Sequence, residues 1–338
     1  MLFSIIVPVY NVKNYIEECL QSIIFQAIDF PLGAEIILVD DGSTDGSGEI
    51  CNRYWIKYPE IIKVVHQENQ GLLLARRRGF REAKGEYIIN CDSDDKLSQN
   101  CLHELSSVIS KFGTDVVFYN VMAFEPGRES QWTTNIFSNN LCEIVDSAQV
   151  LDNYLLTYEC VSMWCKTFKR RCLDFNLDYS EYRRLNMGED TLQSAEIYSH
   201  ASTYSYLNKT LYYYRCAVGM TSKFVEDYYF QFKQVCKIIE KTEKIAQIND
   251  FDKKMAVKVF GIAARSITQG RKDRRYSYSA EKEYLKTIRE DELVQKYAQL
   301  YGDIKFKLQR SHRVLCGMLL KRFYLGIWLM IKLYNWVS

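Results

Sequence analysis

Residues 3–90 alternate between short apolar runs and segments with apolar residues at helical spacing, and this alternation most constrains the fold. In the segment 14–26, for example, Ile16, Leu20 and Ile23 recur at the spacing that gives a helix one apolar face. Such alternation is typical of an α/β layer with a mostly parallel sheet. The predicted strands are Phe3–Val7, Glu35–Val39, Ile61–Val65, Tyr87–Ile89 and Val116–Tyr119, and the predicted helices are Asn14–Gln26, Gly48–Tyr58 and Gly71–Lys84.

Three polar loops follow predicted strands of this layer. They are Pro8–Asn11, where the first strand should end because proline cannot donate to a ladder, Asp40–Ser47, and Asp92–Asp95. Ligands of open α/β sheets bind at the carboxyl ends of the strands, so we expect a site where these loops meet. Loops are polar in most proteins, which leaves chance coincidence as the alternative.

The segment Glu86–Leu97, EYIINCDSDDKL, carries the strongest single signal. Its strand opens onto Asp92, Asp94 and Asp95, and carboxylates this close repel one another unless a positive charge is present. Side chains alternate along an extended chain, so Asp92 and Asp94 lie on one side. That arrangement suits a hard cation such as Mn²⁺ or Mg²⁺ that also holds phosphate oxygens, whereas Asp-Ser-Asp-Asp in isolation favours a polar turn.

The composition excludes several classes of protein. Lys and Arg number 44 and Asp and Glu 42, so the net charge of +2 gives no nucleic-acid signature. The 11 cysteines show no CxxC spacing, which favours reduced thiols in a cytoplasm over a disulfide framework or a zinc site. The apolar run at the N-terminus contains Pro8 and lacks a basic region, so it is interpreted as a strand and not a signal peptide.

Beyond residue 120 the pattern is less regular. Residues 125–147 are predicted to form loops, Thr191–Tyr198 a helix that begins after Glu189-Asp190, and Tyr212–Arg215 an edge strand. Phe224–Ile248 and Phe251–Thr268 have helical spacing, with a basic connector around residues 271–275 after them.

The tail, residues 305–338, has seven Lys or Arg and no Asp or Glu. Its apolar run Phe323–Ile331 is shorter than the roughly 20 residues that span a bilayer. Arg310, Lys321 and Lys332 are 11 residues apart, which would place them on one face of a continuous helix. A basic stripe opposite Leu, Ile, Phe and Trp predicts a helix lying in a membrane interface, and the alternative is a helix packed on protein.

Read together, five motifs resemble glycosyltransferase family 2, whose members have the GT-A fold. They are SIIVPVYN at Ser4–Asn11, VDDGSTDGS at Val39–Ser47, NQGLLLARRRG at Asn69–Gly79, CDSDD at Cys91–Asp95 and the acid pair Glu189-Asp190. The match covers residues 1–125 closely and residues 160–222 more loosely. The resemblance implies a GT-A domain over residues 1–223, with a nucleotide-sugar half (1–125) and an acceptor half (126–223), followed by a helical region over residues 224–338.

The resemblance also implies a function: inverting transfer of a sugar from a nucleotide-sugar, a UDP-sugar being favoured, to a hydroxyl of a saccharide or lipid-linked saccharide. Cell-surface polysaccharide synthesis at the inner face of the cell membrane is the implied setting. Asp190 would be the general base, and Glu189 its neighbour in the acid pair. Asp94 and Asp92 would hold the metal, and the donor would be bound by Pro8, Tyr10, Asp40, Asp41, Arg76 and Asp92.

Each role has a structural alternative. Glu189-Asp190 suits the positive end of a helix, where acids are favoured. Trp164 offers a flat face for a sugar ring, or is ordinary core. Arg76 could offset phosphate charge or form a surface ion pair, and surface ion pairs are favoured for Arg77 and Arg78.

The sequence departs from the family pattern at three places. Leu73 stands where a small residue is usual, and Arg77 where Asn is common. No histidine lies between His200 and His312, so the third metal ligand is undefined, and Arg215 is a candidate for the diphosphate.

Three other classes of protein agree less well with the sequence. A catalytically inactive module that binds a sugar-nucleotide would keep the pocket, but the intact Asp92, Asp94 and Asp190 argue against it. No GxGxxG follows the first strand and no GxxxxGK[ST] occurs, which argues against a dinucleotide oxidoreductase and a P-loop enzyme.

Overall fold

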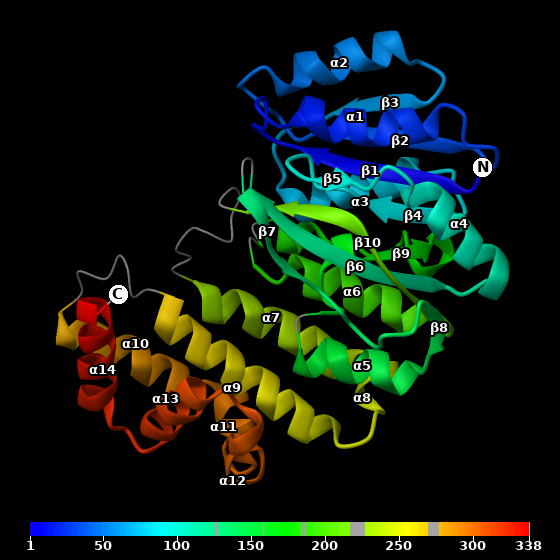
Figure 1. Ribbon diagram of the computed structural model, residues 1–338. Coiled ribbons are helices and arrows are strands. Elements are labelled where there is room, and N and C mark those ends of the chain that lie inside the picture. The colour runs from blue at the N-terminus through cyan, green and yellow to red at the C-terminus, as the bar shows by residue number, and fades with distance from the viewer. Residues whose placement is uncertain are drawn as a thin grey trace. The chain divides into compact units, whose positions relative to one another are not determined.

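The computed structural model describes residues 1–125, 128–157, 159–183, 185, 187–216, 227–269 and 277–337 (Figure 1). The chain divides into two compact units, Met1–Val218 and Gly219–Ser338. The predicted boundary between residues 223 and 224 lies outside the described residues, as does the predicted connector at residues 271–275.

The first unit is built on one sheet, whose described strands run in the order β3-β2-β1-β4-β9-β6-β10-β5, with β7 on β6 and β8 on β10. Strands β1 to β4 are parallel, β9 is antiparallel to both β4 and β6, and β10 is parallel to β6. The strands are β1 (Phe3–Val9), β2 (Ala34–Asp40), β3 (Ile62–His66), β4 (Tyr87–Asn90), β5 (Lys96–Leu97), β6 (Val116–Glu125), β7 (Arg128–Thr133), β8 (Cys142–Val145), β9 (Lys166–Lys169) and β10 (Tyr204–Arg215).

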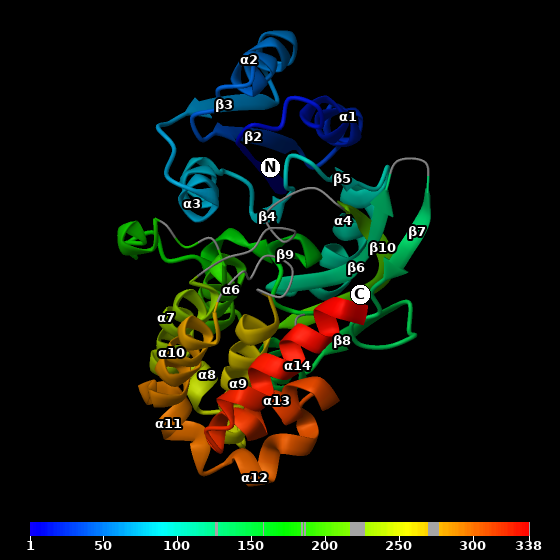
Figure 2. The same cartoon turned by 90° about the vertical axis from the view of Figure 1, so that its left-hand side faces the viewer.

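Helices cover both faces of this sheet. Figure 2 shows α1 (Ile16–Ala27) and α4 (Cys101–Phe112) on one face, and α3 (Leu72–Glu82) and α6 (Glu189–His200) on the other. The remaining helices are α2 (Ser47–Lys57), α5 (Ser147–Leu156) and a 3₁₀ turn, η1 (Met163–Cys165). The predicted α/β class, with a mostly parallel sheet flanked by helices, is confirmed.

The core lies where the apolar strands meet these helices. Ile5, Ile6 and Val7 of β1 are completely buried between β2 and β4, as near-continuous apolar strands of a parallel sheet should be. Helix α3 packs closely on β1 at Gly79, where a Cβ atom would lie 2.4 Å from Ile6 Cγ2. Any larger residue there would move α3, and with it the arginines of the site.

Strand β1 extends two residues past the predicted end at Val7. Pro8 is accommodated because β1 pairs with β4 only up to Ile6, so at Pro8 the strand has one neighbour, β2. The missing N–H of proline is therefore tolerated within a strand of the sheet interior.

Two predictions for the second half of this unit are wrong. Residues 125–147 are not all loop, because β7 and β8 form within them by pairing with the long strands β6 and β10. Tyr212–Arg215 is not an edge strand: it is the end of the 12-residue β10, which lies between β6 and β5. Its tyrosines are retained inside the sheet because they have polar or aromatic partners there.

The second unit is helical over its described residues. Its elements are α7 (Tyr228–Lys241), α8 (Glu243–Ala246), α9 (Phe251–Gln269), α10 (Tyr278–Glu290), α11 (Glu292–Ala298), α12 (Tyr301–Ile304), α13 (Arg310–Leu320) and α14 (Tyr324–Val337). The predicted helix Phe251–Thr268 is confirmed as α9, the central helix, which contacts α7, α11, α12 and α13. The predicted helix Phe224–Ile248 is interrupted at Thr242, whose backbone leaves the helical region.

The tail is not one continuous helix. It breaks after Leu320, and Arg322 adopts a φ of 60°, so Arg310, Lys321 and Lys332 do not share a helix face as predicted. The break lets Leu315, Cys316 and Leu319 of α13 and Ile327 of α14 become buried within the unit. Among the described helices, none combines the length and apolar character needed to cross a bilayer.

Candidate active site

The first two predicted loops are joined by hydrogen bonds at the carboxyl ends of β1 and β2. The Asn11 side chain accepts from the Thr44 N–H at 2.8 Å, and the Asn11 N–H donates to Ser43 Oγ at 3.1 Å. Asp45 accepts from the Lys13 N–H at 2.9 Å. The loop Asp40–Ser47 therefore fixes the position of the segment that carries Tyr10.

Tyr10 and Pro8 lie at this edge of the sheet. Pro8 is inside β1, beside Val39 of β2, and shapes the strand end instead of presenting a polar group. Tyr10 follows the strand and has 51% of its surface exposed, so its ring is accessible to a flat ligand such as a nucleotide base.

Asp40 and Asp41 are buried and bonded to protein. Asp41 accepts from the Gln70 and Gly71 N–H groups, each at 2.8 Å, and from Gln67 Nε2 at 2.7 Å. Asp40 accepts from the Ser43 N–H at 3.0 Å and lies 2.8 Å from His66 Nδ1. An ionised carboxylate offers about four acceptor positions, so each acid fixes its loop and retains acceptor capacity for a ligand.

The acid loop, Asp92–Asp95, follows β4. Asp95 is fully enclosed: its carboxylate accepts from Tyr212 Oη and from the Arg215 N–H, each at 2.7 Å. The Asp94 carboxylate has no hydrogen bond from any described residue, and burial together with the Asp92 charge raises its pKa to about 6. Asp94 is thus the acid of this loop that lacks compensation.

Arg76 connects the acid loop to helix α6. This arginine is 1% exposed; its Nη2 donates to both oxygens of Asp92, at 2.9 and 3.1 Å, and its Nη1 to Asp190 Oδ1 at 2.5 Å. The predicted metal ligand and the predicted base therefore lie on either side of one guanidinium. The surface-pair alternative for Arg76 is excluded by its burial.

The neighbouring arginines have different roles. Arg78 forms the predicted exposed pair, with Glu82 at 3.0 Å. The surface pair predicted for Arg77 is wrong: Arg77 is 1% exposed and makes two bonds, at 2.8 and 2.9 Å, to Glu196 of α6. This buried pair links α3 to α6, which sets the distance that Arg76 spans. No local signal separates the two arginines, apart from their positions on successive faces of the helix.

The acid pair begins α6. Gly188, with a φ of 93°, precedes Glu189 and Asp190, which occupy the first turn of the helix. A role at the helix N-terminus and a role in catalysis are compatible, because the helix dipole favours acids at this position whichever role they have. Burial and the adjacent Asp190 charge raise the pKa of Glu189 to about 8, whereas Asp190 faces Arg76.

Trp164 and Arg215 bracket the acid loop on its other side. Trp164 stacks on Tyr212 with ring centroids 5.9 Å apart, and the Tyr212 hydroxyl accepts from the Asp92 N–H at 3.0 Å. Arg215 is 3% exposed; its Nε donates to the Asp94 carbonyl at 2.7 Å, and its Nη2 to Glu18 at 2.5 Å. Arg215 therefore holds the backbone of the acid loop.

Sequence reasoning missed Tyr212, Glu18 and Lys166. Tyr212 and Glu18 hold the acid loop through the contacts above. Lys166 is buried and donates to three carbonyls of the segment before Trp164, those of Cys160, Val161 and Ser162. The run of tyrosines at 212–214 was the one local signal, and the partners of Glu18 and Lys166 are visible only in the folded chain.

The residues of the acid loop fit a divalent cation in part. Among the described residues, no group of three or more His, Cys, Asp or Glu side chains is arranged as a complete metal site. Asp94 offers a hard oxygen ligand, because no described residue donates a hydrogen bond to its carboxylate and its pKa is raised by burial and by Asp92. Asp92 could offer a second, although its oxygens also accept from Arg76 and Asn90. A cation held by these two acids would need its remaining ligands from a diphosphate and water.

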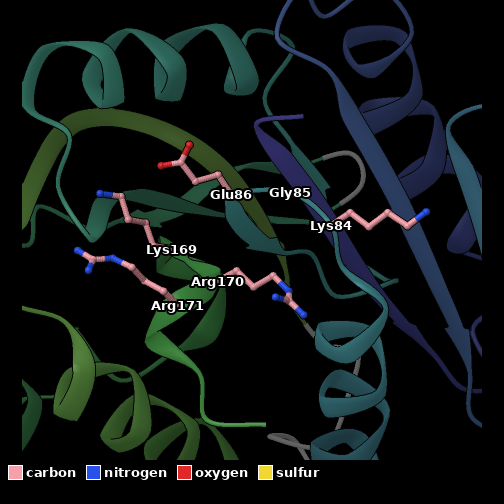
Figure 3. Close-up of a pocket in the computed structure, with 6 residues that line it drawn as sticks. All are labelled: Lys84, Gly85, Glu86, Lys169, Arg170 and Arg171. Carbon is pink, nitrogen blue, oxygen red and sulfur yellow. The ribbon is translucent and has the colours of Figure 1, made fainter.

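A basic hollow of about 330 Å³ lies elsewhere in this unit, at the amino-terminal end of β4. It is lined by Lys84, Gly85, Glu86, Lys169, Arg170 and Arg171. Figure 3 shows that these side chains do not converge, since Lys84 extends away from Lys169 and Arg171. Both Lys169 and Arg171 already pair with Asp115, at 3.5 and 2.5 Å.

Comparison with known proteins bears on the family and the fold. The model of the family described as glycosyl transferase family 2 matches residues 4–171. The solved structure of S. aureus TarS 1-349 in complex with UDP superposes with a TM-score of 0.69 at 22% identity, covering 100% of this chain and 92% of TarS 1-349. At that identity the likeness shows the fold, and GT-A is therefore the fold of this chain.

Curated relatives give the same family. The chain is 34% identical over 227 residues to glycosyltransferase GlyA of Streptococcus pneumoniae, but spans only 31% of its length. It is 30% identical over 214 residues to the minor teichoic acid biosynthesis protein GgaB of Bacillus subtilis, of which it spans 23%. It is 32% identical to S. pneumoniae glycosyltransferase GlyG over 224 residues, 72% of that protein's length, and the chain therefore belongs to glycosyl transferase family 2 and is a glycosyltransferase.

Proposed function

We propose that the chain transfers a sugar from a nucleotide-sugar, a UDP-sugar being favoured, to a hydroxyl of a saccharide or lipid-linked saccharide, with inversion at the anomeric carbon. The observation that carries the proposal is the bridge from Asp92 through Arg76 to Asp190. It brings an acid loop that could hold a diphosphate through a divalent cation to within one side chain of Asp190, a carboxylate suited to an incoming alcohol.

The relatives support the choice of donor and acceptor. TarS has been solved with UDP and with UDP-GlcNAc, which favours a uridine donor. GgaB and GgaA of Bacillus subtilis are named for minor teichoic acid biosynthesis, which favours an acceptor that becomes part of a cell-surface polysaccharide. Both features are transferred here as part of the proposal.

In the proposed reaction, the acceptor oxygen forms a bond to the anomeric carbon while the bond from that carbon to the diphosphate oxygen breaks. The leaving electron pair goes to the diphosphate, and Asp190 takes the proton of the acceptor hydroxyl. Arg76 engages Asp190 through Oδ1 only, and no described residue donates a hydrogen bond to Oδ2. Arg76 therefore orients the base and leaves one of its oxygens for the acceptor.

Mn²⁺ or Mg²⁺ is the proposed cofactor, held by Asp94 and Asp92. When bound, the cation would offset the charge that develops on the departing nucleoside diphosphate. The protein contributes the shape of the loop: Asp95, Tyr212 and Arg215 hold its backbone and keep Asp94 turned out of the hydrogen-bond network. Tyr10, with Asp40 and Asp41 behind it, would receive the base and ribose.

The decisive experiment compares Asp190→Asn with wild type. A thermal-shift panel of nucleotide-sugars with Mn²⁺ first identifies the donor, since a bound donor raises the melting temperature. Asp190→Asn should bind that donor normally and release UDP at least about 100-fold more slowly in the presence of acceptors, which is the range for loss of a general base. Asp29→Asn, an exposed acid on the same unit, is the control.

Normal UDP release by Asp190→Asn would reject Asp190 as the base. Wild type could instead bind the donor and release no UDP with any acceptor in a broad screen. That result would support the alternative, a module that binds sugar-nucleotides without turnover. The two failures are separate, because binding and release are measured independently.

We also propose that the second unit attaches the enzyme to the cytoplasmic face of the membrane through α14. Leu325, Leu329 and Leu333 recur every four residues on this helix and are 46%, 45% and 69% exposed. Exposed basic residues, Lys321 and Arg322, precede the helix. An apolar row beside positive charge suits an anionic lipid surface.

Flotation with vesicles of phosphatidylglycerol and phosphatidylcholine tests this attachment. Changing Leu329 and Leu333 together to Ser should reduce vesicle binding by roughly tenfold or more, because both side chains would lose their apolar environment. Deleting residues 313–338 is a poor test, since it removes the buried Leu315 and Ile327. Equal flotation of the double variant and wild type would refute attachment through α14.

A further inference from the structure

A groove of about 1010 Å³ lies on the face of the sheet covered by α1 and α4. It is lined by α1, by the segment Lys96–Asn100, and by the ends of β6 and β10. Arg76 and Asp190 belong to α3 and α6, which cover the other face, so the groove is not the reaction centre described above (Figure 2). Its volume is at the upper end of the range for ligand sites, roughly 300–1,000 Å³.

Aromatic rings form its apolar surface. Phe25 of α1 is 79% exposed on the groove, an unusual position for a phenylalanine. Across the groove, Phe124 and Tyr213 meet edge to face with ring centroids 6.5 Å apart and are both part-exposed. Rings of this kind can receive the C–H faces of a sugar, which pack as flat apolar surfaces.

Amide side chains supply the polar surface. Gln21, Gln99 and Asn100 are exposed, and no described residue forms a hydrogen bond with their side chains. Each amide both donates and accepts, as sugar hydroxyls do. The floor beneath them is already satisfied: Gln26 donates to the Ser98 carbonyl at 3.0 Å and accepts from the Leu102 N–H at 3.0 Å. The floor is therefore fixed, while the rim retains free hydrogen-bonding groups.

The groove carries no unbalanced charge. Its two lysines are paired, Lys96 with Glu18 at 2.7 Å and Lys209 with Glu104 at 2.6 Å. A polyanion such as a phosphodiester polymer or a nucleic acid requires free cations, which the groove does not offer. The balance of charge therefore selects a neutral ligand.

From this lining we infer that the groove is a second saccharide site, which binds a neutral oligosaccharide segment of the acceptor or product chain. The inference rests on the proposed function for the biological source of that chain. The groove also adjoins the acid loop: Phe124 lies 4.3 Å from Lys96 Nζ and 4.6 Å from the Arg215 guanidinium, the group that holds the Asp94 carbonyl. A chain bound there lies next to the residues that shape the donor site.

The test is a printed array of neutral oligosaccharides, from disaccharide to hexasaccharide, with phosphorylated counterparts. Purified full-length protein is applied in EDTA without any nucleotide-sugar, so that the reaction centre contributes little. Wild type should bind neutral oligosaccharides longer than disaccharides. Phe25→Ser should weaken that binding at least about fivefold, the scale expected for loss of an aromatic anchor.

Ile56→Ser is the matched control, because Ile56 is 74% exposed on α2 of the same unit and lies outside the groove. It should bind as wild type does. The inference is overturned if no neutral oligosaccharide is bound, if only phosphorylated ones are bound, or if Phe25→Ser and Ile56→Ser bind equally. Asp190→Asn should bind the array as wild type does. The array therefore tests the groove even if Asp190 proves not to be the general base.

Discussion

Two acid-rich loops follow parallel strands of the same sheet, but Asp41 of the first loop and Asp94 of the second differ in their hydrogen-bond partners. In the loop Asp40–Ser47, Asp41 receives three hydrogen bonds from protein groups. Burial would raise the pKa of Asp45, but hydrogen bonds from Ser47 and from the Lys13 N–H lower it. In the acid loop, burial and the charge of Asp92 raise the pKa of Asp94.

This difference in hydrogen-bond partners distinguishes a carboxylate that stabilises the fold from one that can bind a ligand. A carboxylate surrounded by protein donors stabilises the fold in its charged form, since the donors would otherwise be unsatisfied. A raised pKa alone does not make this distinction, because burial and the charges of Asp94 and Asp92 also raise the pKa of the hydrogen-bonded Asp95. Asp94 differs because no described residue donates a hydrogen bond to its carboxylate, which leaves it available to an external cation. On the proposed function, the first loop would hold its edge of the sheet in shape, and Asp94 of the second would carry the charge that meets the cation.

The largest expected effect is that of Asp94→Asn. This change should lower turnover by roughly 10²–10³-fold, the range for loss of one group that stabilises developing charge, and should weaken the response to Mn²⁺. It should leave stability without added metal unchanged or slightly higher, because a poorly compensated charge is removed. Initial rates over a Mn²⁺ titration and urea unfolding measure the two quantities. Full activity in the presence of a chelator would contradict the role of Asp94.

A smaller effect, on a different quantity, is expected for Asp41→Asn. An amide oxygen cannot replace both oxygens of the carboxylate, so a part-buried N–H group, that of Gln70 or Gly71, loses its partner. The free energy of unfolding should fall by about 1–3 kcal/mol. Urea denaturation beside Asp94→Asn is the measurement. If Asp94→Asn proved the less stable of the two, the distinction between the loops would be lost.

The first half of the unit was predictable because its information is local. Strand–helix alternation gave β1 to β4 and α1 to α3, and the motifs placed Asp92, Asp94 and Asp190 before any contact was known. Arg76 was assigned to the site for its place in a motif. The structure brings it between Asp92 and Asp190 as no spacing rule could, since Asp190 lies 114 residues away in sequence.

What escaped prediction depends on distant partners. Arg77 finds Glu196, 119 residues along the chain, and Tyr212 finds Asp95, 117 residues away. β7 and β8 form because β6 and β10 extend far enough to pair with them, although β7 is polar and β8 is only four residues long. The tail breaks at Arg322 because α13 and α14 bury different faces, which a periodic count of basic residues does not reveal.

Arg76 has one further consequence. A single guanidinium binds both Asp92 and Asp190. The effects of substituting the two acids on stability and activity should therefore not be additive. Loss of Arg76 would remove an ion-pair partner from two part-buried carboxylates at once. Among related sequences, we therefore expect the residues at positions 92, 76 and 190 to vary together.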